Sequence, residues 1–145
     1  MKTIKEINVR LEDRPGSLSD LSELLAANGI RILALTFRPE GAHGTLCFVP
    51  NDTVRAFNTL ESGGYSIWER EIIAAEVPTH PGGLNAILKC LKLAHVNIEY
   101  IYSHLGGHGV GHRTILVLGV DNVPAAHDAL AKEWIRLYGD EFYTL

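Results

Sequence analysis

Hydrophobic and polar positions follow two different periods along the first half of the chain. Residues 7–12 alternate apolar and polar side chains, which predicts a half-buried strand. From Ser17 onward leucines recur every three or four residues, which predicts a helix that ends at Asn28-Gly29. The same reasoning predicts strands at 30–38, 45–49 and 65–70, with a helix between 50 and 64. The predicted order of elements is therefore βαββαβ.

The second half of the chain repeats this order. Residues 73–104 align with residues 7–38 at an offset of 66 without a gap, and six of the 32 positions are identical. A strand at 114–120, a helix from Asp121 and a final strand at 141–145 complete the second copy. The apolar face of that last helix is expected to carry Val123, His127, Leu130 and Trp134. Self-similarity of this kind predicts two units, residues 1–71 and 72–145.

Unpaired edge strands would be exposed if the two units stayed apart. We therefore expect an α+β fold in which the units pair into one antiparallel sheet of eight strands with the helices on one face. The strand of 65–70 is expected to run with little break into 72–77.

A Pro-Gly turn occurs at the same place in both copies, between the first strand and the first helix. The two segments are Asp13–Leu18 and Thr79–Leu84. Such a turn leaves backbone N–H groups free at the helix start, where an anion or a carboxylate can bind. Ser17 is predicted to cap the first helix, with Asp20 completing a motif close to a capping box.

Composition excludes several classes of function. A formal net charge of −4 is not the charge of a nucleic-acid-binding protein, and no cluster of basic residues indicates a membrane surface. The chain has no signal-type start and no run of 18 apolar residues, so we expect a cytoplasmic protein. Cys47 and Cys90 stand in apolar surroundings and are expected to be reduced, buried thiols.

Three histidines, His104, His108 and His112, recur every four residues inside a glycine-rich stretch. On a helix this spacing would suit zinc or nickel, but four glycines make a helix unfavourable and a turn is expected instead. The turn can still gather His104 and His112 near His80, or cover a ligand. We expect no metal and no cofactor.

No catalytic motif accompanies these features. The chain lacks a nucleophile elbow, a phosphate loop of the P-loop type and a dinucleotide-binding fingerprint. The glycines between 106 and 111 follow a strand but precede another strand and not a helix. We therefore expect a protein that is not an enzyme.

The first copy resembles the ACT domain, a small ferredoxin-like regulatory module that binds amino acids. Asp13, Gly16 and Leu18 match the family's strand-to-helix loop, and Asn28-Gly29-Ile30 matches its helix exit. The second copy diverges, with Thr79 in place of the acid and Ala94-His95-Val96 at the exit. The resemblance extends over almost the whole chain, and the chain is most similar to small stand-alone tandem ACT proteins.

The resemblance implies ligand sites between units, each made by the loop of one unit and the second-strand start of its neighbour. The first site would combine Asp13, Arg14, Pro15, Gly16, Ser17 and Leu18 with His95, Val96 and Asn97. The mirrored site would combine His80, Pro81, Gly82, Gly83 and Leu84 with Gly29, Ile30 and Arg31. Backbone N–H groups after Gly16 suit a ligand carboxylate and Asp13 suits an α-ammonium group. Arg14 can pair with the ligand carboxylate or remain a solvated charge.

These features predict a regulatory protein that senses a free amino acid and shifts its own assembly or the activity of a partner enzyme. A homodimer is expected, without nucleic acid or membrane as a partner. One alternative is a regulatory subunit of an amino-acid biosynthetic enzyme such as acetolactate synthase, although such subunits carry a further C-terminal region. The other is a dimerisation scaffold that binds no ligand.

Overall fold

The structure is a computed structural model of the 145-residue chain, and it describes residues 1–106 and 113–145. Its contacts divide it into two compact units. The first unit comprises Lys5–Arg70, and the second comprises Met1–Ile4 together with Glu71–Leu145.

The first unit contains nearly all of its first strand, two further strands, two helices and the beginning of a fourth strand. In chain order they are β1 (Ile4–Glu12), α1 (Ser17–Ala27), β2 (Ile32–Glu40), β3 (His43–Pro50), α2 (Thr53–Ser62) and β4 (Ser66–Glu76). Strand β4 continues past Arg70, so its last residues belong to the second unit. The second unit adds α3 (Gly83–Leu93), β5 (Ile98–Ser103), β6 (Ile115–Val120), α4 (Val123–Lys132), β7 (Leu137–Tyr138) and a 3-10 helix, η1 (Asp140–Thr144).

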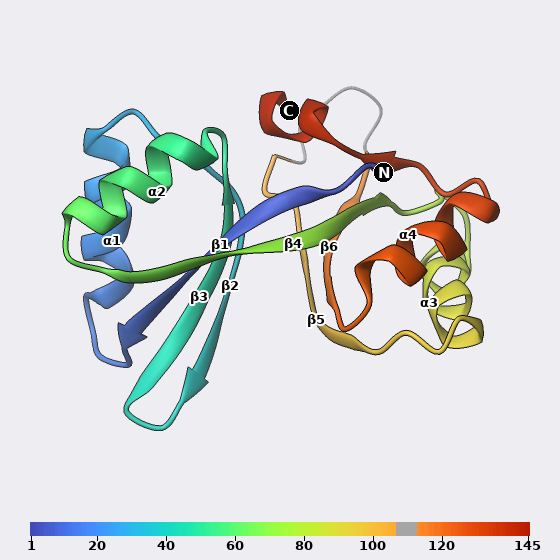
Figure 1. Cartoon of the computed structure of the whole chain (residues 1–145), viewed down its shortest axis with the longest axis horizontal. Coiled ribbons are helices and arrows are strands. Elements are labelled where there is room, and N and C mark those ends of the chain that lie inside the picture. The colour runs from blue at the N-terminus through green and yellow to red at the C-terminus, as the bar shows by residue number, and fades with distance from the viewer. Residues whose placement is uncertain (107–112) are drawn as a thin grey trace. The chain divides into compact units, whose positions relative to one another are not determined.

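The described residues contain seven strands. In the first unit β3 pairs with both β1 and β2, and in the second unit β6 pairs with both β4 and β5, while β4 also pairs with β7 (Figure 1). The register places Ile7 opposite Phe48 on β1 and β3, and Ile73 opposite Leu118 on β4 and β6. Both pairings are antiparallel, and the predicted α+β fold of two repeated units is confirmed.

The predicted number of eight strands was wrong. The strands expected at 65–70 and 72–77 form the single strand β4, and the strand expected at 141–145 is the 3-10 helix η1. Phe142, Tyr143 and Thr144 are residues that favour strands, but the chain turns at Gly139. Phe142 donates its N–H to the Gly139 carbonyl at 3.0 Å, and the turn buries its ring completely. Burying one large aromatic ring stabilises the turn more than a short edge strand would.

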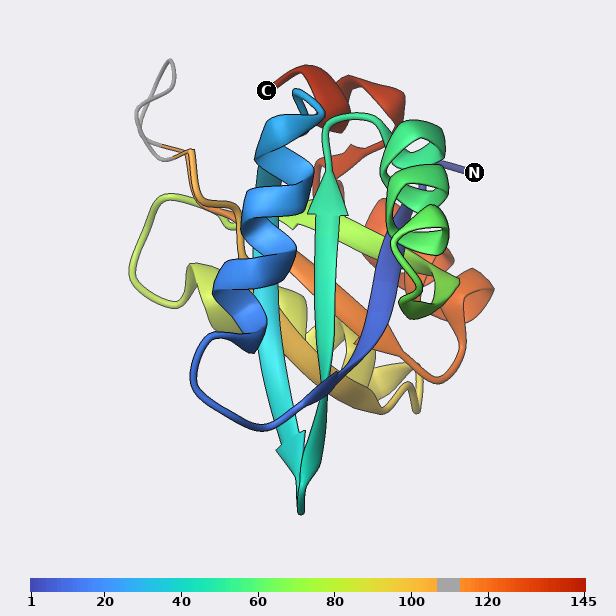
Figure 2. The same cartoon turned by 90° about the vertical axis from the view of Figure 1, so that its left-hand side faces the viewer.

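In the first unit α1 and α2 lie side by side over one face of β1, β2 and β3 (Figure 2). The side chains between the helices and the sheet are those that the strand alternation and the helical spacing predicted, and they are almost fully buried. They include Ile7, Val9, Leu11, Leu21, Leu25, Phe48 and Leu60. Each such side chain contributes about 1.5–3 kcal/mol when it leaves water.

The second unit has a corresponding core beneath α3 and α4. It includes Ile73, Ala75, Ile87, Leu91, Leu118, Val120 and Leu130. The prediction for Trp134 was wrong, because α4 ends at Lys132 and the Trp134 side chain lies outside the apolar face with 93% of its surface exposed. Helical periodicity cannot show where a helix ends without a terminating glycine.

Candidate functional site

The first Pro-Gly turn connects the end of β1 at Glu12 to the start of α1 at Ser17. Gly16 stands at the N-cap position with a φ of 90°, in the left-handed region, and its carbonyl accepts the N–H of Asp20 at 2.8 Å. No side chain caps the helix. The prediction that Ser17 is the N-cap was therefore wrong: Ser17 is the first helical residue, and it is buried.

This backbone geometry leaves donors at the helix start. The first N–H groups of an α-helix have no acceptor within the helix, and here no side chain supplies one. The N–H groups of Leu18 and Ser19 are in this position. A Cβ on Gly16 would meet only the Arg14 guanidinium, at 3.8 Å, so the glycine is required by its φ and not by lack of space.

Charges surround the turn on its solvent side. The Arg14 guanidinium lies 3.0 Å from a Glu12 carboxylate oxygen and 3.7 Å from an Asp20 carboxylate oxygen, and it donates to the Pro15 carbonyl at 3.1 Å. These ion pairs are exposed, so each contributes little to stability. Arg14 thus shares its charge between two carboxylates of its own unit.

A cleft of about 350 Å³ opens beside the turn, within the first unit. Its lining residues come from the end of β1, the turn, the start of α1, the start of β3 and the segment that leads into β4. They are Arg10, Leu11, Glu12, Arg14, Ser17, Asp20, His43, Gly64, Tyr65 and Ser66. The register of β1 and β3 pairs Glu12 with His43, which explains how residues 31 positions apart reach one cleft. The volume lies within the range of small-ligand sites.

Both signs of charge are present in this cleft. Glu12 and Asp20 are anionic, Arg14 balances part of that charge, and Arg10 is a second cation. Among the described residues Arg10 has no ion-pair partner. The Tyr65 hydroxyl and the His43 imidazole add further polar groups to the lining. A site with an available cation next to carboxylates is suited to a small zwitterion.

The second Pro-Gly turn repeats the backbone of the first. Gly82 has a φ of 86°, and its carbonyl accepts the N–H of Ala86 at 3.0 Å. Gly83 replaces Ser17, and a Cβ there would lie 1.9 Å from the Pro78 carbonyl oxygen. His80 has its Nδ1 2.9 Å from the Pro81 carbonyl. The second turn therefore has the same donors, but Pro78, His80 and Ala86 stand where the first turn has Glu12, Arg14 and Asp20.

The two segments predicted to face these turns lie at the C-terminal ends of α1 and α3. Gly29 and His95 both take a left-handed φ, of 70° and 56°, directly after their helices. In each case the next residue, Ile30 or Val96, donates its N–H to the carbonyl five residues before it at 3.0 Å. Arg31 and Asn97 follow, and their N–H groups donate to Asn51 and Asp121 side chains.

Within one unit a turn and its own helix exit cannot form one small site. Helix α1 has 11 residues, so about 16 Å separates its two ends. A site that combines a turn with a second-strand start must therefore take the two parts from different units. The two predicted sites, each a turn of one unit with the second-strand start of another, therefore stay predictions.

Sequence reasoning did not assign Leu11, Glu12 and Asp20, which adjoin the turn, to the site, and it missed Arg10, His43, Gly64, Tyr65 and Ser66. Arg10 is on the polar side of the first strand and resembles any exposed strand residue. The other four are distant in sequence, and only strand pairing and the end of α2 place them beside the turn.

The predicted histidine motif falls largely outside the described residues, since His108 and His112 lie in the range 107–112. His104 is described: its Nδ1 accepts the N–H of Gly106 at 3.0 Å, and its ring meets Phe142 edge-on at 5.3 Å. Residues 1–106 and 113–145 contain no group of three or more possible ligands that could hold a metal ion. Cys47 is buried and Cys90 is partly buried; both are free thiols.

No helix in the described part of the chain is both long and apolar enough to cross a membrane.

The fold and the paired turns define a class: two α+β units in tandem, each with a glycine turn before its first helix. The family model of the ACT domain pair matches residues 2–141, and the chain belongs to this family. Among the curated proteins, no match was found.

Solved structures share the fold. Protein BT0572 from Bacteroides thetaiotaomicron is 24% identical with a TM-score of 0.88, and the match covers 99% of this chain and 97% of that one. The regulatory subunit of aspartate kinase from Thermus thermophilus, in a ligand-free form, is 16% identical with a TM-score of 0.62 and coverage of 91% and 93%. The corresponding subunit from Thermus flavus is 20% identical, with a TM-score of 0.61 and coverage of 90% and 92%.

Proposed function

We propose that this chain is a regulatory protein that binds a free amino acid at the first Pro-Gly turn. The observation that carries the proposal is the cleft beside the first turn, which is lined by groups of both charges and by Ser17 and Asp20 of the first turn of α1, where no side chain caps the helix. Backbone N–H groups and Arg10 suit the ligand's carboxylate, while Asp13 and the neighbouring carboxylates suit its ammonium group. Membership of the ACT domain pair family supports a regulatory and not a catalytic role.

The mechanism we propose is a shift between arrangements of the units. A ligand that contacts the first turn and the second-strand start, residues 95–97, makes its full set of contacts only when these parts are docked. It therefore favours that arrangement by the difference between its affinities for the two states. A homodimer would provide such neighbouring units, and the expected readout is a change in assembly or in a partner's activity.

A partner enzyme is the second candidate for the readout. The structural relatives from Thermus thermophilus and Thermus flavus are regulatory subunits of aspartate kinase, an enzyme that acts on an amino acid. By analogy this chain would be a regulatory subunit of an amino-acid biosynthetic enzyme. Co-purification with a larger enzyme from the source cells would favour this alternative. A dimerisation scaffold without a ligand would neither co-purify with an enzyme nor respond to an amino acid.

A thermal-shift screen against the twenty free amino acids tests the proposal. A ligand that binds only the folded chain raises the melting temperature in proportion to RT ln(1 + [L]/Kd), so a hundredfold excess over Kd adds about 2.7 kcal/mol. Size-exclusion chromatography of the same samples reports any change in assembly. If none of the twenty amino acids raises the melting temperature at millimolar concentration, amino-acid sensing is wrong.

The chain offers a matched pair of variants for this screen. Gly16→Val and Gly82→Val introduce the same side chain at two left-handed positions, one in each turn. Neither position has a neighbour closer than 3.8 Å to an added Cβ, so the two substitutions should cost similar stability. Gly16→Val is expected to abolish the ligand-dependent shift and Gly82→Val to retain it. A shift that survives Gly16→Val would show that the ligand binds elsewhere.

A further inference from the structure

Corresponding positions in the two units carry opposite charges next to the Pro-Gly turns. Arg10 of β1 lies opposite Thr45, and Glu76 of β4 lies opposite Ile115. The offset of 66 between the repeated segments relates Arg10 to Glu76, and the strand registers agree with this relation. A cation in the first unit therefore corresponds to a carboxylate in the second.

Two further positions around this pair also differ. Tyr65 and Ile135 follow the ends of α2 and α4 in the same way, each donating its N–H to a leucine five residues earlier. The next residues, Ser66 and Arg136, are therefore equivalent. Thr45 of β3 and Ile115 of β6 are equivalent by their pairing with Arg10 and Glu76, so Arg113, two residues before Ile115, corresponds to His43.

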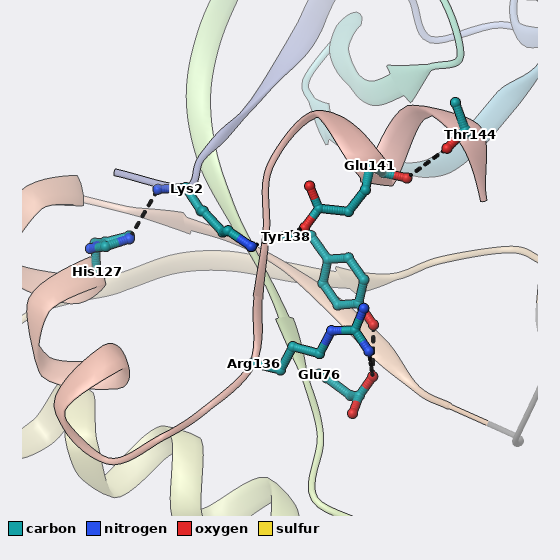
Figure 3. Close-up of polar contacts among 7 residues, drawn as sticks. All are labelled: Lys2, Glu76, His127, Arg136, Tyr138, Glu141 and Thr144. Carbon is teal, nitrogen blue, oxygen red and sulfur yellow. Dashed lines mark hydrogen bonds and ion pairs between the residues drawn. The ribbon is translucent and has the colours of Figure 1, made fainter.

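Glu76 is surrounded by partners in the second unit (Figure 3). The Tyr138 hydroxyl donates to Glu76 Oε1 at 2.6 Å, and the same oxygen lies 3.7 Å from Arg113 Nε and 3.9 Å from Arg136 Nη1. The Arg136 guanidinium also lies over the Tyr138 ring, 4.8 Å from its centroid. Figure 3 shows the tyrosine and Arg136 both directed at the Glu76 carboxylate.

Burial strengthens this arrangement. The Glu76 side chain is 25% exposed, whereas Tyr138 is 1% exposed. Burial of the ring and its hydrogen bond to Glu76 raise the pKa of Tyr138, so the hydroxyl keeps its proton and remains a donor. The second unit therefore contains both a carboxylate and the cations that hold it. The first unit contains the cation Arg10, which forms no ion pair with a carboxylate of the described residues.

We propose that the Glu76 carboxylate occupies, in the second unit, the place that a ligand carboxylate would take in the first unit. In the first unit that place stays open. The chain would then take one amino-acid ligand from solution and not two. This count of one ligand rests on the proposed function. The filled site itself rests only on the contacts of Glu76.

Chemical rescue by acetate tests the filled site without any knowledge of the ligand. Glu76→Ala removes the carboxylate and leaves the two arginines and Tyr138 without it. We expect the melting temperature to fall by about 4–8 °C, because a charge-assisted hydrogen bond and two ion pairs are lost. Sodium acetate should then restore part of that loss relative to sodium chloride at equal ionic strength, and it should leave the unaltered chain unchanged.

Two further variants control the rescue. Glu76→Gln fills the same volume without the charge, so it should fold and should gain little from acetate. Adding Arg136→Gln to Glu76→Ala should weaken the rescue by removing one of the cations. Acetate that shifts all variants equally, or that fails to shift Glu76→Ala, would overturn the proposal.

The two proposals fail separately. Rescue by acetate together with a negative amino-acid screen would retain the filled site and reject amino-acid sensing. A positive screen without acetate rescue would retain sensing and reject the role of Glu76.

Discussion

Trp134 offers a direct test of how backbone conformation limits the stability of the second unit. It follows helix α4 with a φ of 61°, and its N–H donates to the Ala131 carbonyl at 3.1 Å. Gly64 occupies the equivalent place after α2, with a φ of 85° and a bond to the Glu61 carbonyl at 3.1 Å. Replacing Trp134 with glycine gives the second unit the residue that the first unit uses.

The structure gives the expected magnitude. A non-glycine residue in the left-handed region costs about 1–2 kcal/mol, and the greater freedom of glycine in the unfolded chain offsets about 0.4–1 kcal/mol. The Trp134 side chain is 93% exposed, so its removal sacrifices little burial. Trp134→Gly should therefore stabilise the chain by roughly 1 kcal/mol and raise its melting temperature by about 3 °C. The converse change, Gly64→Ala, should destabilise by a similar amount, since its added Cβ meets nothing within 4 Å.

Urea unfolding followed by far-UV circular dichroism measures these changes without depending on tryptophan fluorescence. Trp134→Ala is the matched control, because it removes the indole but keeps the left-handed strain. It should leave the midpoint near that of the unaltered chain. Equal midpoints for Trp134→Gly and Trp134→Ala would refute the backbone explanation, as would a lower midpoint for Trp134→Gly.

Three other changes test the remaining contacts. Tyr138→Phe should destabilise by about 1–2 kcal/mol in a denaturant titration at neutral pH, because it removes the 2.6 Å bond to Glu76. Burial first, and then that bond, raise the pKa of Tyr138 above its ordinary value of 10.0, so its stabilising contribution is complete below pH 10 and declines as the pH rises further. Stability measured from pH 9 to 11 should therefore decline less in Tyr138→Phe than in the unaltered chain. Asp52→Ala should cost about 1 kcal/mol in the same titration, because Asp52 caps α2 by accepting the Arg55 N–H at 3.1 Å, and an unchanged midpoint would contradict this. Gly16→Ala should cost about 1 kcal/mol from its φ alone, and a loss of several kcal/mol would indicate a clash that the structure does not contain.

Local patterns in the sequence were sufficient to predict most of the elements and the duplication. Alternation over 7–12 and the leucine spacing after Ser17 depend on which side of a strand or helix faces the core, and that is a short-range property. The Pro-Gly turns were also predicted from the sequence in both copies, and the structure gives Gly16 and Gly82 a left-handed φ there. The resemblance to the ACT domain followed from these same residues.

The errors arose where local patterns could not decide between alternatives. Residues 141–145 include aromatic and β-branched side chains that favour a strand, yet the burial of Phe142 against Tyr138 and His104 makes a 3-10 turn the better arrangement. Trp134 continues the helical spacing of α4 but lies beyond the helix end. Ser17 has the chemistry of an N-cap, but the left-handed Gly16 moves the cap back by one residue.

The sequence by itself determined the two repeated units, the position of both turns and the class of fold, because periodicity, glycine and proline act over a few residues. Only the tertiary structure decided what surrounds each turn. Antiparallel pairing brings His43 to the first turn, and the end of α2 brings Tyr65 there. The same pairing in the second unit surrounds Glu76 with two arginines and a tyrosine. Charges that are distant along the chain interact only after the strands have paired, so two similar turns acquire different surroundings.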